Sequence, residues 1–172
     1  MGVFYPVRGG AEALGAGVAV HWCAARSRIA LMHSLTLAST NRHDIATRIA
    51  GPRWIVACLC AAWCGTCATY RAAFDALAAR HPDKDFIWID IEDQADVVGD
   101  LDVDNFPTLL IQHQDTVAFF GTMLPDAALA DRLVKAQAAQ SDAELARLAS
   151  SSEERRDWQR HCNLRTLLRS AG

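Results

Sequence analysis

No stretch of the 172-residue sequence is apolar for long enough to form a transmembrane helix. There is also no excess of one charge, since the formal net charge is −3, and this argues against nucleic acid or an anionic membrane as a partner. Six cysteines are too few for a disulfide-built scaffold of this length. A hydrophobic content of 51% instead predicts one globular domain with a core large enough to fold without disulfides.

Metal-binding patterns are missing as well. Structural zinc sites usually pair two C-x-x-C units across a loop, and this sequence has one such unit. The six histidines are scattered without ligand spacing, so we expect them on the surface or in loops. Haem attachment through C-x-x-C-H is excluded because Ala68 follows the pair. We therefore predict neither a bound metal nor an organic cofactor.

The C-x-x-C unit that is present, Cys64 and Cys67 in the segment WCGTC, is the most informative feature of the sequence. Thiols with this spacing lie about one helical turn apart, so they share a face and can close a disulfide. An apolar run at 54–60 predicts a buried strand before the pair, and helical spacing of apolar residues in 68–80 predicts a helix after it. Free amides and the dipole at a helix start stabilise a thiolate at Cys64, which indicates thiol–disulfide exchange.

The rest of the central region alternates strands and helices. This order, closed by a hairpin, predicts an α/β fold with a mixed central sheet and helices on both faces. We predict further strands at 34–38, 86–91, 106–111 and 116–120, and further helices before Gly51-Pro52, at 93–101 and from Pro125 towards Ala139.

Both ends lie outside this pattern. Residues 1–33 are rich in glycine and alanine without a sustained period, so we interpret them as a disordered or loosely structured leader, or as sequence ahead of a true start at Met32. Residues 11–25 look like the apolar part of an export signal, but Glu12 and His21 interrupt the run. Export or lipid anchoring is therefore the alternative.

Residues 140–172 form a charged helical tail with two amphipathic stretches. Because amphipathic helices usually bury their apolar stripe within the same molecule, we predict an appendage packed loosely on the core. A partner-binding element is the alternative. The isolated Cys23 and Cys162 are predicted to have no catalytic role, although His161 next to Cys162 could in principle activate that thiol.

Taken together, these features resemble the thioredoxin family over roughly residues 34–138. The resemblance is carried by the strand–WCGTC–helix unit, by Phe106-Pro107-Thr108, and by the strand and short helix between them. It implies a thioredoxin-like domain over 34–139, with a helical C-terminal extension. Trp63 would shield one side of the site, which Gly65, Thr66 and Phe106 help to shape. Pro107, in cis, would face the dithiol and leave backbone groups exposed for an extended substrate segment.

The same resemblance implies a protein-disulfide reductase. Cys64 would attack a substrate disulfide, and Cys67 would resolve the mixed disulfide. The partners would be disulfide-containing proteins and an external electron donor such as a flavoprotein reductase. We expect a cytoplasmic monomer that uses no cofactor, nucleic acid or membrane. A thioredoxin-like binding or redox-sensing module without general turnover is the alternative function.

Four positions depart from the family pattern. Thr66 replaces a proline that favours a strongly reducing pair, so the redox poise is left open. Cys58 stands at the position of a buried aspartate, Trp88 at that of its accompanying lysine, and Ala68 at that of a basic residue after the second cysteine. With these tuning groups absent, we expect a slower or more specialised enzyme than a general thioredoxin.

Two further cysteines lie on the strand before the pair. Cys58 and Cys60 alternate with Leu59, so both point to the same side of the strand. One interpretation is that both residues are small buried hydrophobes, as cysteine commonly is. The other is that Cys58 lies beneath Cys67 and exchanges with it as a third thiol.

Overall fold

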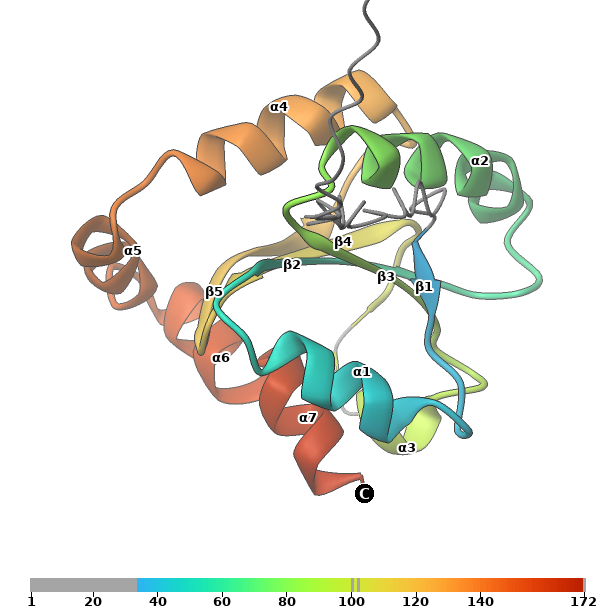
Figure 1. The fold of residues 1–172 in the computed structure, drawn as a ribbon, viewed down its shortest axis with the longest axis horizontal. Helices are drawn as coiled ribbons and strands as arrows, with labels where there is room; N and C mark the ends of the chain where they lie inside the picture. Colours follow the sequence, from blue (N-terminus) through green and yellow to red (C-terminus); the bar gives the residue numbers. More distant parts are fainter. Residues whose placement is uncertain (1–33, 100, 102, 172) are drawn as a thin grey trace, which may run out of the picture.

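The computed structural model describes residues 34–99, 101 and 103–171. These residues form a mixed five-stranded sheet with helices on both faces, as the alternating pattern predicts (Figure 1). The strand order is β1-β3-β2-β4-β5, in which β1, β3 and β2 run parallel, and β4 and β5 complete the sheet with antiparallel pairings. The strands are β1 (Leu35–Thr36), β2 (Trp54–Cys60), β3 (Asp85–Asp90), β4 (Thr108–His113) and β5 (Thr116–Thr122).

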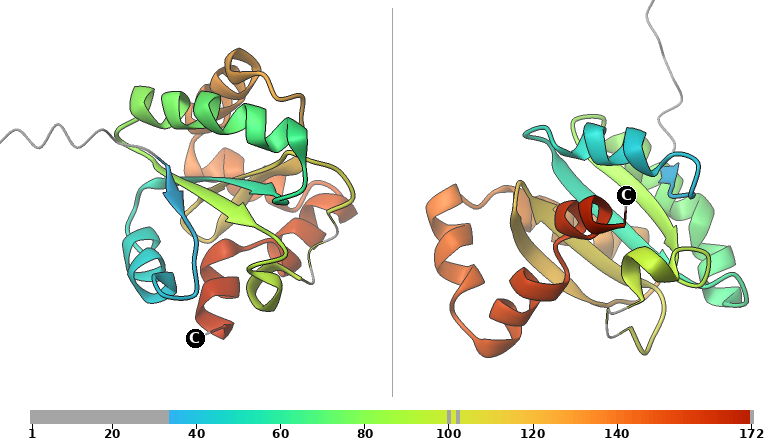
Figure 2. Two further views of the ribbon diagram at one scale, coloured as in Figure 1. Left: turned by 90° about the vertical axis from the view of Figure 1, so that its right-hand side faces the viewer. Right: turned by 90° about the horizontal axis from the view of Figure 1, so that it is seen from below.

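The helices form a layer on each face of the sheet. Helices α2 and α4 cover one face, and α1, α3 and α7 cover the other, with α5 and α6 continuing around the β5 edge (Figures 1 and 2). In the described part of the chain the helices are α1 (Arg42–Ile49), α2 (Gly65–Arg80), α3 (Ala95–Val98), α4 (Ala127–Ala138), α5 (Asp142–Ala149), α6 (Glu153–His161) and α7 (Leu164–Ser170).

The boundaries of β4 and β5 differ from the predictions. β4 begins at Thr108 rather than at residue 106, because proline has no N–H to donate to a ladder. β5 continues beyond the predicted end at residue 120, and Gly121 lies within it and pairs with Leu109. The predicted site-shaping residues Phe106 and Pro107 therefore lie in the loop before β4, and the bond between them is cis.

β2 is buried on both sides, which explains its nearly continuous apolar sequence. Its side chains alternate between two clusters. Ile55, Ala57 and Leu59 face α1, α3 and α7, whereas Cys58 and Cys60 face α2 and α4. All of the thiols near the C-x-x-C unit therefore belong to the same core cluster.

The tail is an integral part of the core and is not packed loosely as predicted. Leu164 and Leu168 of α7 are only 1% and 3% exposed, and they lie in the cluster that covers the α1 face of the sheet. Leu145 of α5 is also buried. The amphipathic pattern correctly identified the apolar stripe of the tail helices. It could not show how completely the sheet would cover that stripe.

Buried polar groups fix the tail in place. The Gln112 side chain donates from Nε2 to Asn163 Oδ1 at 2.9 Å and accepts the Leu164 N–H at 2.9 Å. The Arg165 Nε donates to the Ile49 carbonyl oxygen at 2.6 Å. Because a buried amide without a partner is costly, these bonds select one position for α7 on the sheet.

His81 and Cys162 are both buried. His81 lies in a loop, as predicted, but it is buried, and its Nε2 lies 2.7 Å from Asp131 Oδ1, which ties the end of α2 to α4. Cys162 is also buried, and burial raises its pKa to about 12. The exposed His161 therefore does not produce an activated thiol at Cys162.

Predictions for the N-terminal region, including Met32, Cys23 and the export-like stretch, lie outside the described residues. Among the helices that are described, none combines the length and apolar character required to cross a membrane.

Replacing Leu168 with alanine tests how far the tail supports the fold. We expect Leu168→Ala to lower the free energy of unfolding by about 2–5 kcal/mol, because it opens a cavity in the core. Leu124→Ala is the matched control, since Leu124 is 72% exposed, and it should change stability by less than about 0.5 kcal/mol. Chemical denaturation measures both, and equal losses would contradict the buried position of α7.

Candidate dithiol site

Cys64 is held at the beginning of α2, directly after the turn that leaves β2. It is the N-cap residue, and its Sγ accepts a hydrogen bond from the Cys67 backbone N–H at 3.3 Å. The first amides of a helix have no partner within the helix, so a sulfur here takes the role that a serine or aspartate oxygen usually has. Cys64 is half-buried and Cys67 is buried one turn further on, as the C-x-x-C spacing predicts.

The environments of the two thiols move their pKa values in opposite directions. The hydrogen bond with the Cys67 thiol lowers the pKa of Cys64, and the amides of Cys67 and Thr66 lower it further. Burial raises the pKa of Cys67, and its contacts with the Cys60 and Cys64 thiols raise it more. The site therefore favours a thiolate near the surface and a protonated thiol beneath it.

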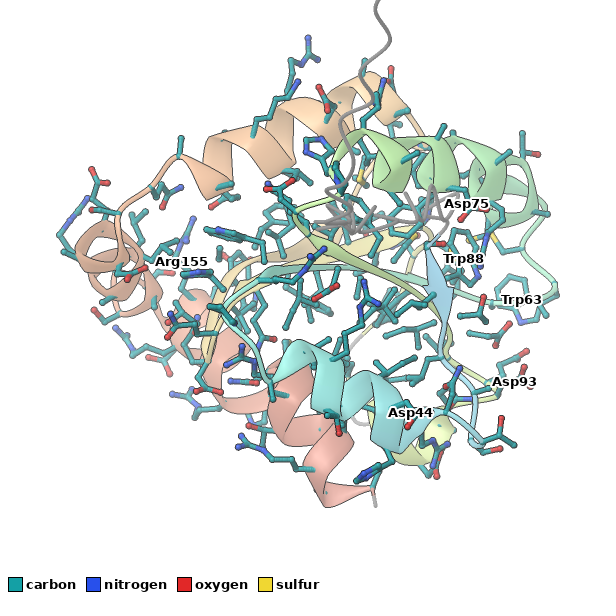
Figure 3. All side chains as sticks on the ribbon, in the orientation of Figure 1. Asp44, Trp63, Asp75, Trp88, Asp93 and Arg155 are labelled. Atoms are coloured by element: carbon teal, nitrogen blue, oxygen red, sulfur yellow. The ribbon has the colours of Figure 1, made fainter. Side chains whose placement is uncertain are left out.

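Trp63 lies beside the dithiol and is 69% exposed. Figure 3 shows its side chain at the outer edge of the molecule, away from the core. Its ring makes an edge contact with Phe106 at 5.6 Å between centroids, and its Nε1 donates to Glu92 Oε1 at 3.0 Å. An exposed indole held at two points provides a rigid apolar wall next to Cys64.

Pro107 is cis, as the resemblance implied, and it is buried. Its carbonyl oxygen accepts the Met123 N–H at 3.1 Å, so this oxygen is already engaged within the chain rather than free for a substrate. The same hydrogen bond places Leu124, the next residue, near the site. Leu124 and Trp63 are the large hydrophobic side chains that the described residues leave most exposed.

Gly65 and Thr66 lie between the two cysteines, and both are exposed. A Cβ at Gly65 would meet nothing within 4 Å, so packing does not require a glycine there. The hydrogen bond from Thr66 to the Cys64 sulfur comes from the backbone amide, which any residue except proline can supply.

Sequence reasoning missed Arg71. Its guanidinium lies 4.8 Å from the ring centroid of Trp88, and its Nε lies 3.2 Å from Asp75 Oδ2. Because Arg71 follows Cys67 by four residues, helical spacing could have placed both on one face. They border a pocket of about 310 Å³, which is lined by Ala61, Ala62, Cys67, Ala68, Arg71, Trp88 and Asp90.

Cys60 was also missed as a neighbour of the dithiol. Its thiol interacts with that of Cys67, and its Sγ lies 3.7 Å from Cys58 Sγ. Hydrogen bonding with Cys58 and burial raise the pKa of Cys60. Cys58 is buried beside Cys60. The buried hydroxyl of Tyr70 belongs to the same cluster and has no hydrogen-bond partner there.

The structure brings the predicted site residues 63–67 together with Phe106 through the Trp63–Phe106 contact. In the described ranges, no group of three or more histidine, cysteine, aspartate or glutamate side chains is arranged to hold a metal ion. The arrangement provides two neighbouring thiols, one with a lowered and one with a raised pKa, beside the exposed apolar side chain of Trp63.

Comparisons with known proteins agree with this geometry. The chain is 39% identical to a thioredoxin of Ophiophagus hannah over 59 residues, which span 34% of this chain and 56% of that protein. The match therefore covers little more than half of that relative. The crystal structure of thioredoxin from Trypanosoma brucei brucei superposes with a TM-score of 0.56 at 17% identity, covering 67% of this chain and 99% of that one.

The spinach chloroplast thioredoxin F (short form) superposes with a TM-score of 0.54 at 18% identity, covering 63% of this chain and 96% of that one. At such identities the two structures support the fold alone. The family model of thioredoxin matches residues 36–135, more than half of the chain. The chain therefore belongs to the thioredoxin family.

Proposed function

We propose that this protein is a thiol–disulfide oxidoreductase that reduces protein disulfides through Cys64 and Cys67. The observation that carries the proposal is the placement of the two thiols at the start of α2, where the Cys64 sulfur accepts the Cys67 N–H and Cys67 is buried one turn further on. The Cys64 thiolate attacks a substrate disulfide, forms a mixed disulfide and releases one substrate thiolate. Cys67 then loses its proton and attacks Cys64 Sγ. The products are a reduced substrate and a Cys64–Cys67 disulfide.

The second step needs a proton acceptor for Cys67. Cys58 occupies the family's carboxylate position, and its neighbour Cys60 interacts with Cys67. The pocket beside Cys67 opens next to Asp90 and gives water a route to the buried thiol. Water is a weaker base than a carboxylate, so resolution should be slower here than in a general thioredoxin.

Substrate docking is assigned to the exposed apolar side chains around Cys64. Trp63 is held rigidly by Phe106 and Glu92, and Leu124 follows the residue that is bonded to Pro107. Exposed apolar groups around a reactive centre favour contact with apolar stretches of a protein substrate. The regenerating reductant would be an external donor, such as a flavoprotein reductase, and a reducing compartment such as the cytoplasm would keep the pair as a dithiol.

A second candidate is a binding or redox-sensing module without general turnover. The raised pKa of Cys67, combined with a cysteine at position 58, favours this candidate because both slow the resolving step. Such a module would retain its partner as a mixed disulfide rather than release it reduced. A measurement of disulfide-reducing turnover distinguishes the two candidate functions.

The rate of Cys64 alkylation by iodoacetamide should report its lowered pKa. Because the thiol is unreactive below its pKa, we expect the rate to reach half its maximum below about pH 8.5, the value of an ordinary cysteine. Cys67→Ala removes the thiol that lowers the pKa, so the midpoint should rise. Peptide mass spectrometry follows the reaction, and a wild-type midpoint at or above that of a free cysteine would contradict the proposed nucleophile.

Insulin reduction with dithiothreitol tests turnover. We expect Cys64→Ser to abolish it. When insulin is added without dithiothreitol, Cys67→Ser should accumulate a mixed disulfide with the substrate. Cys162→Ser is the matched control, because Cys162 is buried in the opposite core cluster, and it should retain wild-type turnover. If the wild-type protein shows no turnover but holds a partner covalently, the module is correct and the reductase is not.

The reduction potential of the pair tests the direction of the reaction. A reductase should lie near the thioredoxin value of about −270 mV, whereas a value near −120 mV would indicate an oxidase. Thr66→Pro removes the amide that stabilises the Cys64 thiolate, so it should make the potential more negative. Equilibration with glutathione buffers measures both proteins.

A further inference from the structure

Four cysteines, here called the cysteine file, lie between the surface and one core cluster. Cys64 is half-buried at the start of α2, and Cys67, Cys60 and Cys58 are buried beneath it in one cluster. The Cys64 and Cys67 thiols interact, the Cys67 and Cys60 thiols interact, and Cys60 Sγ lies 3.7 Å from Cys58 Sγ. The proposed function uses only the outer two members of the file.

Cys60, and not Cys58, is the inner thiol that neighbours the dithiol. Both residues face α2 because they alternate along β2, but Cys60 is the last residue of the strand and Cys58 lies two residues further from the turn. Cys58 Sγ lies beside Cys60 Sγ.

We propose that Cys60 is a second exchange partner of Cys67. This rests on the proposed function, because it starts from the Cys64–Cys67 disulfide. The Cys60 sulfur attacks Cys67 Sγ, the Cys64–Cys67 bond breaks, and a Cys60–Cys67 bond forms. Cys64 leaves as a thiolate, and the Cys60 proton passes to it or to solvent. One disulfide replaces another, so the step needs no external oxidant or reductant.

The leaving group and the nucleophile of this exchange affect its rate in opposite ways. Cys64 is a good leaving group because its environment stabilises the thiolate. Cys60 is a poor nucleophile because hydrogen bonding with Cys58 and burial keep it protonated. The exchange is therefore slow compared with turnover, and it matters when the oxidised protein persists without a reductant.

The product differs chemically from the ordinary oxidised protein. Its disulfide is buried in the core, and Cys64 is again a free thiol at the surface. That thiol can still attack a substrate disulfide, but Cys67 is occupied and cannot resolve the mixed disulfide. Sustained oxidation would thus turn a releasing enzyme into one that holds its substrate covalently.

Disulfide mapping of the oxidised full chain tests the inference. The protein is oxidised with diamide, held for increasing times, alkylated with iodoacetamide and digested with chymotrypsin. Trypsin would leave all four cysteines between Arg53 and Arg71 in one peptide, whereas chymotrypsin cleaves after Leu59 and Trp63 and so separates them. We expect a bridge between peptides 60–63 and 64–70 that grows with time, with Cys64 alkylated.

Variants identify the attacking sulfur. Cys60→Ser should abolish the bridge and slow the reappearance of an alkylable Cys64 by about tenfold or more, because the serine hydroxyl cannot take part in exchange. Cys162→Ser removes an equally buried thiol from the other cluster and should leave the bridge unchanged. Cys58→Ala should also retain it.

The outcomes separate this inference from the proposed function. A Cys64–Cys67 disulfide that stays in place at all times, in the wild-type protein, overturns the role of Cys60 and leaves the reductase intact. Absence of any disulfide between Cys64 and Cys67 overturns both. A bridge that joins Cys58 rather than Cys60 to peptide 64–70 also overturns the inference, since it contradicts the order of the file.

Discussion

The first turn of α2 determines the chemistry of the site. Its amides have no partner within the helix, and the Cys64 sulfur lies where it can accept one of them. The strand before it is buried on both faces and fixes where the helix begins. The same geometry explains the burial of Cys67, because a side chain one turn further along the helix points into the core. The difference between the two thiols therefore arises from neighbouring thiols, backbone amides and burial, and needs no charged side chain beside them.

The same independence from side-chain charge agrees with the four departures from the family pattern that the sequence resemblance implies. A cysteine stands at the usual carboxylate position, a tryptophan at the usual lysine, and an alanine at the usual basic residue. Arg71 lines the pocket beside Cys67, but its guanidinium is occupied with Asp75 and Trp88. In the proposed reaction, proton transfer at Cys67 would therefore depend on neighbouring thiols and water.

Local patterns in the sequence predicted the fold and the place of Cys64, because the burial of one or both faces of an element determines the spacing of its apolar residues. This spacing predicted β2 and α2, and with them the position of Cys64 between the two. It could not predict which residues surround a buried group. His81 is buried because Asp131 lies opposite it, and α7 is fixed because Gln112 offers an amide across the sheet. The alternation of side chains along β2 likewise predicted that Cys58 and Cys60 share one face, but it did not predict which of them contacts Cys67.

The hydrogen bond from Arg165 to Ile49 joins residues 116 positions apart. On a ribosome, α1 and β2 would therefore be synthesised long before the helix that covers them, and their apolar face would stay exposed during that interval. Contacts of such high sequence separation also slow folding, because a long loop must close before they form. During this delay the nascent chain would expose apolar surface of the kind that chaperones bind.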